Sequence, residues 1–191
     1  MSFAWLPNAI TLTRMALAVP LAWLILEGRY GPALVVALVG GGSDAVDGWL
    51  AKRYGWHSWL GGVIDPIADK LLLVAAFTAL TLEGESPVWL FALVLGRDLV
   101  IVVGAVVYHN WIGPLDASPT QLSKFTTLVQ IVYVLARLVD LTPVAAVPGP
   151  LTTGLAWLVA AATLASGIDY VVRWSLKARR VRAAARIEPR A

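Results

Sequence analysis

The chain has 191 residues, of which 59% are hydrophobic and 14% charged, and its formal net charge is +3. A mean hydropathy of +0.75 is too high for an ordinary soluble domain and is typical of a polytopic membrane protein. The absence of cysteine excludes disulfides and thiolate metal sites. We therefore expect an all-α membrane protein, because helices satisfy their own backbone hydrogen bonds in lipid.

Six apolar segments predict six transmembrane helices. Their expected bounds are Asn8–Leu26, Pro32–Ala51, Gly62–Leu82, Pro87–Tyr108, Leu122–Val139 and Thr152–Trp174. Each is close to the roughly 20 residues that a helix needs to cross a bilayer. We interpret residues 1–176 as one membrane domain and residues 177–191 as a basic cytoplasmic tail.

The charge of the connecting segments predicts the orientation of these helices. The tail is rich in Lys and Arg, and Lys52 and Arg53 follow the second apolar segment, whereas the connections after Leu82 and Val139 contain acids and no base. The positive-inside rule then places both termini and the connection after the second segment in the cytoplasm. The tail is expected to contact anionic lipid headgroups. Nucleic-acid binding is disfavoured, because the tail directly follows a span.

The first apolar segment carries Asn8, Thr11 and Arg14, which a helix places on one broad face. Polar groups on a membrane helix are expected to face the protein interior. We interpret Asn8 and Thr11 as functional. For Arg14 two interpretations stay open, an interior contact and snorkelling to the headgroups.

Four aspartates flank the connection between the second and third segments. Asp44 and Asp47 are spaced i, i+3, and Asp65 and Asp69 are spaced i, i+4, so each pair shares one helix face. Two helices joined by a short connection would bring all four carboxylates together. Ionised groups at a bilayer boundary indicate a functional site. The alternative, a salt-bridge cluster with nearby bases, leaves a surplus of negative charge.

Four like charges cannot share a site without compensation. Two divalent cations would balance them, and an all-oxygen ligand set suits Mg²⁺, Ca²⁺ or Mn²⁺. Paired metals roughly 3.5–4 Å apart commonly serve phosphoryl chemistry. Gly48 allows a ligand to approach the backbone closely, and Lys52, one turn further on, can reach a phosphate.

The run D-x-x-D-G-x-x-A-K, from Asp44 to Lys52, is followed after eight residues by G-x-x-x-D-x-x-x-D, from Gly61 to Asp69. This pattern resembles the signature of the CDP-alcohol phosphatidyltransferases. Lys52 departs from it, since the family usually has Arg there; the charge is kept but the bidentate fork is lost. The resemblance implies phospholipid biosynthesis by a homodimer that transfers a phosphatidyl group from CDP-diacylglycerol to an alcohol and releases CMP.

The resemblance also implies a role for each residue of the pattern. Two cations, Mg²⁺ or Mn²⁺, would be held by Asp44, Asp47, Asp65 and Asp69, and Asp69 would act as the general base. CDP-diacylglycerol contacts are implied for Asn8, Thr11, Gly48, Lys52 and Ser58. The localisation that we expect is a bacterial inner membrane, with the active site on the cytoplasmic side.

The acceptor alcohol is predicted from the remaining cations. Arg97, Lys124 and Arg137 are candidates for the acceptor pocket, and no Lys or Arg lies between Asp98 and Lys124. Glycerol 3-phosphate, a dianion, would need several cations. The stretch 118–130 also resembles CMP-forming cardiolipin synthases, so we favour phosphatidylglycerol as acceptor and keep glycerol 3-phosphate as the alternative. Arg97 could instead brace the helices through a buried ion pair.

Two further interpretations complete the prediction. Lys124, Thr127 and Gln130 share one helix face, which we expect to line a water-filled cavity. A cation or proton transporter is the alternative of another class, because intramembrane carboxylates also serve transport. Transporters often have two related halves with broken helices, and the sequence contains no such repeat.

Overall fold

Helices account for nearly all of the chain that the computed structural model describes. It describes residues 6–54, 59–111 and 120–187, with side chains for residues 12–42, 70–108, 110 and 120–177. The helices are α1 (Leu6–Leu26), α2 (Tyr30–Tyr54), α3 (Trp59–Leu82), α4 (Val88–Trp111), α5 (Gln121–Asp140) and α6 (Gly149–Ile187). No strand occurs in these ranges, so the all-α prediction is confirmed.

The described helices have the length and composition of a membrane protein. Val88–Tyr108, Gln121–Asp140 and Gly149–Lys177 are long and apolar enough to cross a bilayer. In the first three helices the described apolar stretches are shorter, at Leu12–Leu26, Tyr30–Gly42 and Lys70–Leu82. Six membrane crossings therefore stay a prediction.

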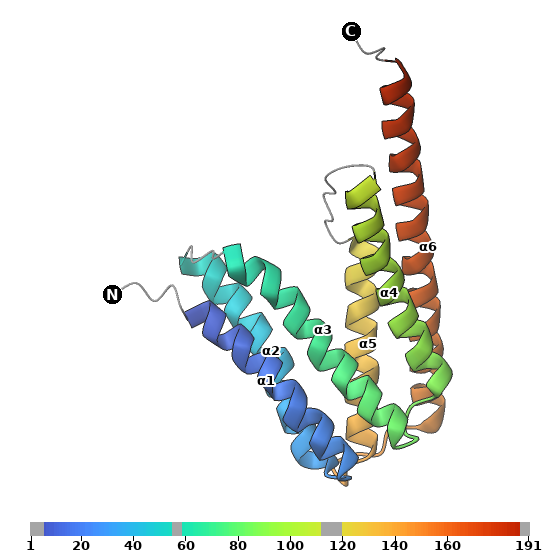
Figure 1. Cartoon of the computed structure of the whole chain (residues 1–191). Helices are drawn as coiled ribbons and strands as arrows, with labels where there is room; N and C mark the ends of the chain where they lie inside the picture. The colour runs from blue at the N-terminus through green and yellow to red at the C-terminus, as the bar shows by residue number, and fades with distance from the viewer. Residues whose placement is uncertain (1–5, 55–58, 112–119, 188–191) are drawn as a thin grey trace.

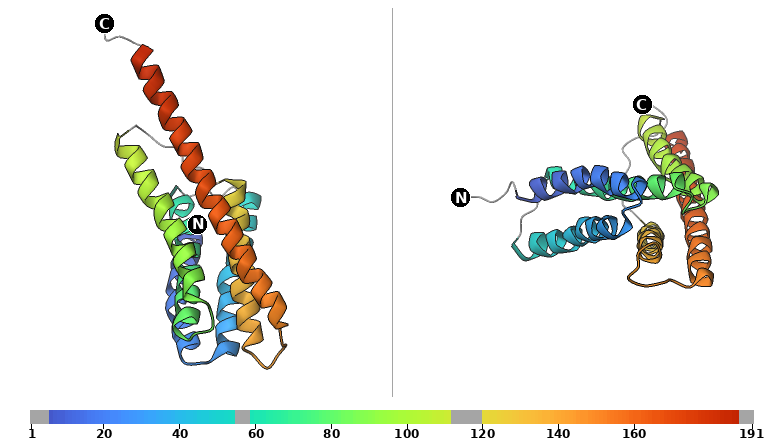
Figure 2. Two further views of the ribbon diagram at one scale, coloured as in Figure 1. Left: turned by 90° about the vertical axis from the view of Figure 1, so that its right-hand side faces the viewer. Right: turned by 90° about the horizontal axis from the view of Figure 1, so that it is seen from below.

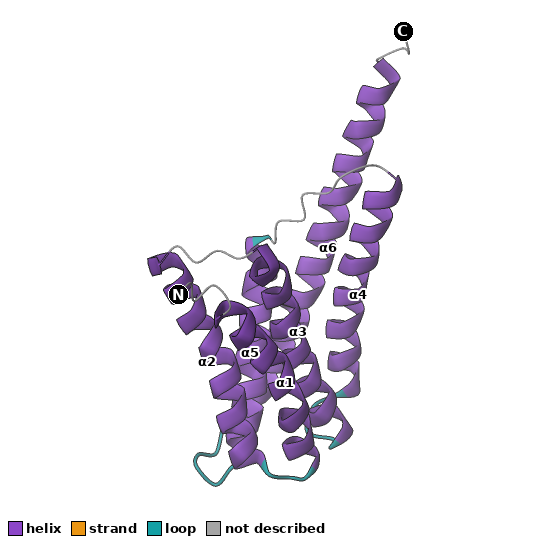
Figure 3. Cartoon of the chain, turned by 60° about the vertical axis from the view of Figure 1, so that its left-hand side comes forward, coloured by secondary structure: helices purple, strands orange, loops and turns teal. Residues whose placement is uncertain are grey.

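The helices form two groups that meet at one end of the molecule. In Figure 1, α1, α2 and α3 converge with α4, α5 and α6 at the lower end and separate from them toward the upper end. Seen from below, α5 lies between α2 and α6 (Figure 2). The turns that leave α1, α3 and α5 all lie at the lower end (Figure 3). The first residues of α1, the last of α2 and the first of α3 lie together at the opposite end.

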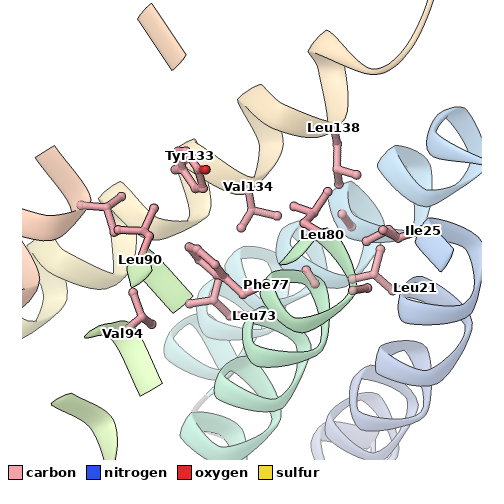
Figure 4. Packing of buried hydrophobic residues seen from close by; sticks show 14 of the residues in the cluster. Leu21, Ile25, Leu73, Phe77, Leu80, Leu90, Val94, Tyr133, Val134 and Leu138 are labelled. Carbon is pink, nitrogen blue, oxygen red and sulfur yellow. The ribbon is translucent and has the colours of Figure 1, made fainter. Parts of the chain in front are cut away.

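An apolar core joins the two groups where they meet (Figure 4). Phe77 and Leu80 of α3 and Leu138 of α5 are each at most 1% exposed. The Phe77 ring stacks on the Tyr133 ring at 5.6 Å between centroids and 21° between planes. Such aromatic pairs add about 0.5–1.5 kcal/mol to the burial itself. The core thus fixes α3 against α5 below the segments that carry the aspartates.

Gly104 allows the close packing of α4 against α6. A Cβ atom at this position would lie 2.6 Å from Cζ3 and 3.0 Å from Cε3 of the Trp174 indole. The same indole packs edge-on against the Tyr170 ring, with 5.2 Å between centroids. Because two neighbours confine this indole, it has little freedom to yield to an added methyl group.

Gly104→Ala is therefore expected to destabilise the protein by about 1–3 kcal/mol through overpacking. Gly96→Ala is the matched control, because it lies on the same helix and a Cβ there would meet nothing within 4 Å. The control is expected to be neutral or stabilising by up to about 1 kcal/mol, since alanine favours helix over glycine. Unfolding in mixed micelles measures both, and equal effects of the two changes would contradict this interpretation of the packing.

The last helix is longer than its apolar segment. We expected the span to end at Trp174, whereas α6 continues as one helix to Ile187 and extends beyond α4 and α5 (Figure 1). Hydropathy falls after Trp174, but the sequence from Leu176 to Ile187 is made of good helix formers with neither Gly nor Pro. The division into a membrane domain and a basic tail stays a prediction.

Candidate functional site

Gly40 allows α2 to lie against α3 about one turn from the first aspartates. A Cβ atom at position 40 would lie 3.0 Å from Cδ2 and 3.3 Å from Cδ1 of Leu72. Asp44 follows Gly40 by four residues, and Asp69 precedes Leu72 by three. The contact therefore places the two aspartate-bearing segments side by side.

The helix rise then sets the height of each aspartate above this contact. Measured from this contact toward the α2–α3 connection, Asp44 lies about 6 Å and Asp69 about 4.5 Å along its own helix axis. Asp47 and Asp65 each lie about 10.5 Å along. The backbone thus puts the four residues at two matched levels on neighbouring antiparallel helices. Their side chains lie outside the described residues, so which oxygens meet stays a prediction.

Four of the other residues predicted to bind CDP-diacylglycerol lie at the same end of the molecule. Asn8 and Thr11 are in the first two turns of α1, and Gly48 and Lys52 are in the last two turns of α2. Their side chains, and Ser58 as a whole, lie outside the described residues.

Arg14, one turn below this end on α1, is 1% exposed in the described chain. Burial of this side chain favours the interior interpretation over snorkelling to the headgroups.

The donor chemistry of the two levels fits divalent cations. Carboxylate oxygens are the ligands that Mg²⁺ and Mn²⁺ prefer, and paired helices can present two such ligands at each level. Where side chains are described, no group of three or more His, Cys, Asp or Glu residues could hold a metal ion. The aspartate pairs lie outside those side chains, and their spacing and donor chemistry make them the candidate metal site.

A partly buried ion-pair network fastens the helix that carries Asp69. Lys70 Nζ of α3 donates to Asp98 Oδ2 of α4 at 2.5 Å. Arg97 Nη1 donates to the other oxygen, Asp98 Oδ1, at 2.8 Å. The Asp98 side chain is 15% exposed and that of Arg97 is 5% exposed. One carboxylate thus joins two cations from two helices, and it holds α3 on α4 one residue beyond Asp69.

Arg97 extends the network to the last two helices. Its Nη2 donates to Ser123 Oγ of α5 at 2.7 Å and to Ser166 Oγ of α6 at 2.5 Å. Its guanidinium carbon lies 5.7 Å from the centre of the Tyr170 ring. These contacts support the bracing interpretation of Arg97 over a direct role in the acceptor pocket. Lys70 was one of the nearby bases in the alternative salt-bridge cluster with the aspartates, whereas the structure pairs it with Asp98 of α4.

The polar face of α5 differs from the predicted wall of a water-filled cavity. Lys124 is exposed, but Gln130 is fully buried and its Nε2 donates to Thr163 Oγ1 of α6 at 3.3 Å. The Thr127 hydroxyl donates to the carbonyl of Ser123 in its own helix at 3.2 Å. The cavity-wall interpretation is wrong for Gln130, whose amide joins two helices because the interior offers a hydroxyl partner.

Arg137 lies away from the other two candidates for the acceptor pocket. It is thirteen residues after Lys124 on α5, which is about 20 Å along the helix axis. Its Nη2 donates to Glu85 Oε2 at 2.7 Å, its Nη1 to Asp140 Oδ2 at 2.8 Å, and its Nε to the Glu85 carbonyl at 2.9 Å. The structure therefore does not bring Arg137 together with Arg97 and Lys124.

The sequence as a whole matches a known family. The family described as CDP-alcohol phosphatidyltransferase matches residues 4–168, which is most of the chain. The chain belongs to this family. The prediction drawn from the aspartate pattern is thus confirmed at the level of the family, a family of membrane transferases of phospholipid biosynthesis.

Relatives in the CDP-alcohol phosphatidyltransferase family carry two kinds of name. The chain is 32% identical over 189 residues to the chloroplastic CDP-diacylglycerol–glycerol-3-phosphate 3-phosphatidyltransferase 1 of Oryza sativa subsp. japonica, covering 90% of this chain and 57% of that protein. It is 33% identical over 150 residues to cardiolipin synthase (CMP-forming) of Homo sapiens, covering 70% and 50%. It is 34% identical over 179 residues to a probable phosphatidylglycerophosphate synthase of Mycobacterium tuberculosis, covering 88% and 80%.

The chain thus spans about half the length of the first two relatives. The first name contains glycerol 3-phosphate and the second names cardiolipin as the product, so the similarity does not distinguish between the two acceptors considered above.

Proposed function

We propose that this protein transfers a phosphatidyl group from CDP-diacylglycerol to an alcohol, with release of CMP. The observation that carries the proposal is the pair of matched aspartate levels on α2 and α3, which the Gly40–Leu72 contact sets side by side. Family membership supports the same reaction class. It leaves the transporter interpretation without support.

The chemistry assigns each residue a task. Two divalent cations, Mg²⁺ or Mn²⁺, held by Asp44, Asp47, Asp65 and Asp69, would supply positive charge for the pyrophosphate. Asp69 takes the proton from the acceptor hydroxyl as its oxygen bonds to the phosphorus of the phosphatidyl group. The bond from that phosphorus to the bridging oxygen breaks, and CMP leaves with the electron pair.

The remaining residues of the pattern hold the nucleotide. Gly48 permits the close approach of the CDP group, and Lys52 donates to a phosphate oxygen. Asn8, Thr11 and Ser58 contact the cytidylyl part. Asn8, Thr11, Gly48 and Lys52 belong to the end of the molecule where the four aspartates lie.

The acceptor that we propose is phosphatidylglycerol, which makes the product cardiolipin. Of the three cations considered for an acceptor phosphate, Arg97 is hydrogen-bonded to Asp98, Ser123 and Ser166, and Arg137 is paired at the other end of α5. Among the described residues this leaves Lys124 as the exposed candidate. One cation suits the single negative charge of a phosphodiester better than the dianion of glycerol 3-phosphate.

The placement in the cell follows from charge. Both termini and the aspartate-bearing end are proposed to be cytoplasmic, in a bacterial inner membrane, because the basic segments lie there. The first residue of α1 and the last of α6 both lie toward that end (Figure 1), which agrees with an even number of crossings. We further propose that the protein acts as a homodimer, as the family resemblance implies.

The acceptor is tested with purified protein, Mn²⁺ and labelled CDP-diacylglycerol. Phosphatidylglycerol and glycerol 3-phosphate are offered separately, and CMP and the lipid product are followed. We expect cardiolipin with phosphatidylglycerol and at least about tenfold less CMP with glycerol 3-phosphate, since one wrong charge pairing costs roughly 1.4 kcal/mol or more. Phosphatidylglycerol phosphate as the main product would overturn the acceptor, and no CMP with either alcohol would contradict the proposed pair of acceptors.

A further inference from the structure

A polar cavity lies at the end of the molecule remote from the aspartates. It occupies about 460 Å³ and is lined by the turn after α3, the first turns of α4 and α6, and the last turns of α5, with Glu85, Trp89, Tyr133, Arg137, Thr152 and Trp157 among its residues. From Asp65 to Leu82 the α3 axis alone rises about 25 Å, so this cavity is separate from the proposed catalytic end. The reaction proposed above uses none of these residues.

The charge around this cavity is uneven. Arg137 is paired with two carboxylates, Glu85 and Asp140, at 2.7 Å and 2.8 Å. The Glu85 side chain is 31% exposed, against 17% for that of Arg137. Among the described residues of this ion-pair cluster one negative charge is in surplus, and the more accessible member is the carboxylate. A cation would be drawn to such a site, whereas an anion would be repelled.

Two indoles form an aromatic wall beside the carboxylate. Trp89 of α4 and Trp157 of α6 lie 5.2 Å apart between ring centroids at 33°. They are 46% and 64% exposed, and both line the cavity. Aromatic faces next to a carboxylate bind organic ammonium groups, with tryptophan the strongest of the aromatic residues.

The floor and rim of the cavity are polar and fixed. The Tyr133 hydroxyl is 3.1 Å from Ser86 Oγ, and the residue is 2% exposed. At the rim the Thr152 hydroxyl donates to the Gly149 carbonyl at 2.9 Å. Polar groups thus line part of a space large enough for a small headgroup.

We propose that this cavity binds an alkylammonium group, held by the Glu85 carboxylate against the Trp89 and Trp157 indoles. The group can come from an aminophospholipid headgroup or from a free amine, since both present the same cation. The site does not depend on the reaction proposed for the aspartate-bearing end.

Native mass spectrometry of the protein in detergent tests this site. Phosphatidylethanolamine and its N-acetyl derivative, which lacks the ammonium group, are offered at equal concentration, and we expect the ammonium lipid to be retained preferentially. Glu85→Gln is expected to weaken its binding about three- to tenfold. Glu83→Gln is the matched control, because it removes the same charge from the same turn without lining the cavity, and its effect is expected to be less than twofold.

Trp157→Ala separates ligand binding from folding, because it leaves the pair between Glu85 and Arg137 intact. It should lower binding of the ammonium lipid by a similar factor. If millimolar ethanolamine displaces the bound lipid, a free amine is sufficient for binding at this site. If only an intact aminophospholipid displaces it, the site requires the lipid headgroup. Equal retention of the two lipids by the parent protein, or equal losses in Glu83→Gln and Glu85→Gln, would overturn the proposal.

Discussion

Replacing Asp69 with asparagine is expected to lower the rate of CMP release about 10²- to 10⁴-fold. Asparagine has nearly the same shape, but it cannot take the proton that the acceptor hydroxyl must lose. Binding of CDP-diacylglycerol should persist, because three other aspartates remain for the cations. Labelled CDP-diacylglycerol measures binding, and CMP release measures turnover on the same preparation.

Asp169→Asn is the matched control for this prediction. Asp169 is also a helix aspartate, but it pairs with Arg173 of its own helix at 2.6 Å, and that arginine side chain is 63% exposed. The control should keep turnover within about twofold, since exposed ion pairs contribute little. Full turnover by the Asp69→Asn variant would remove Asp69 as the base, and loss of binding together with turnover would indicate a structural role instead.

Asp98→Asn is expected to destabilise the protein by about 3–5 kcal/mol. The change leaves the buried Arg97 guanidinium next to the partly exposed Lys70 ammonium, without the carboxylate that joins them. Removing one partner of a buried pair costs more than the pair contributes, because the remaining charge stays desolvated. The free energy of unfolding in mixed micelles measures this loss.

The same Asp169→Asn variant provides the comparison for stability. Its exposed partner should limit the loss to less than about 1 kcal/mol. A loss at Asp98 no larger than the loss at Asp169 would mean that the network does not hold α3 on α4.

The positions of the helices could be predicted from hydropathy, and their contacts could not. The expected spans Gly62–Leu82 and Leu122–Val139 fall within α3 and α5 and end within one residue of them. Apolar runs of this length specify a helix because lipid leaves no other partner for the backbone. The end of α6 was missed, because hydropathy reports burial in lipid, whereas helix propensity continues through Arg and Ala.

For the candidate site, the residues that share a face of one helix could be predicted, but the helices that lie next to each other could not. Spacing alone put Asp44 with Asp47, and Asp65 with Asp69, on common faces. Which helices meet depends on contacts such as Lys70 with Asp98, which are 28 residues apart. Arg137 was grouped with Arg97 by charge alone, and its partner Glu85, 52 residues away, could not be identified from local pattern.

The number of Mn²⁺ ions bound per chain tests the central claim most directly. The purified protein, saturated with CDP-diacylglycerol, is titrated with Mn²⁺ while electron paramagnetic resonance follows the free ion. The two aspartate levels predict two bound ions per chain, and they predict fewer for Asp65→Asn, because one ligand of the set is removed. No bound Mn²⁺, or the same number in the Asp65→Asn variant, would contradict the account.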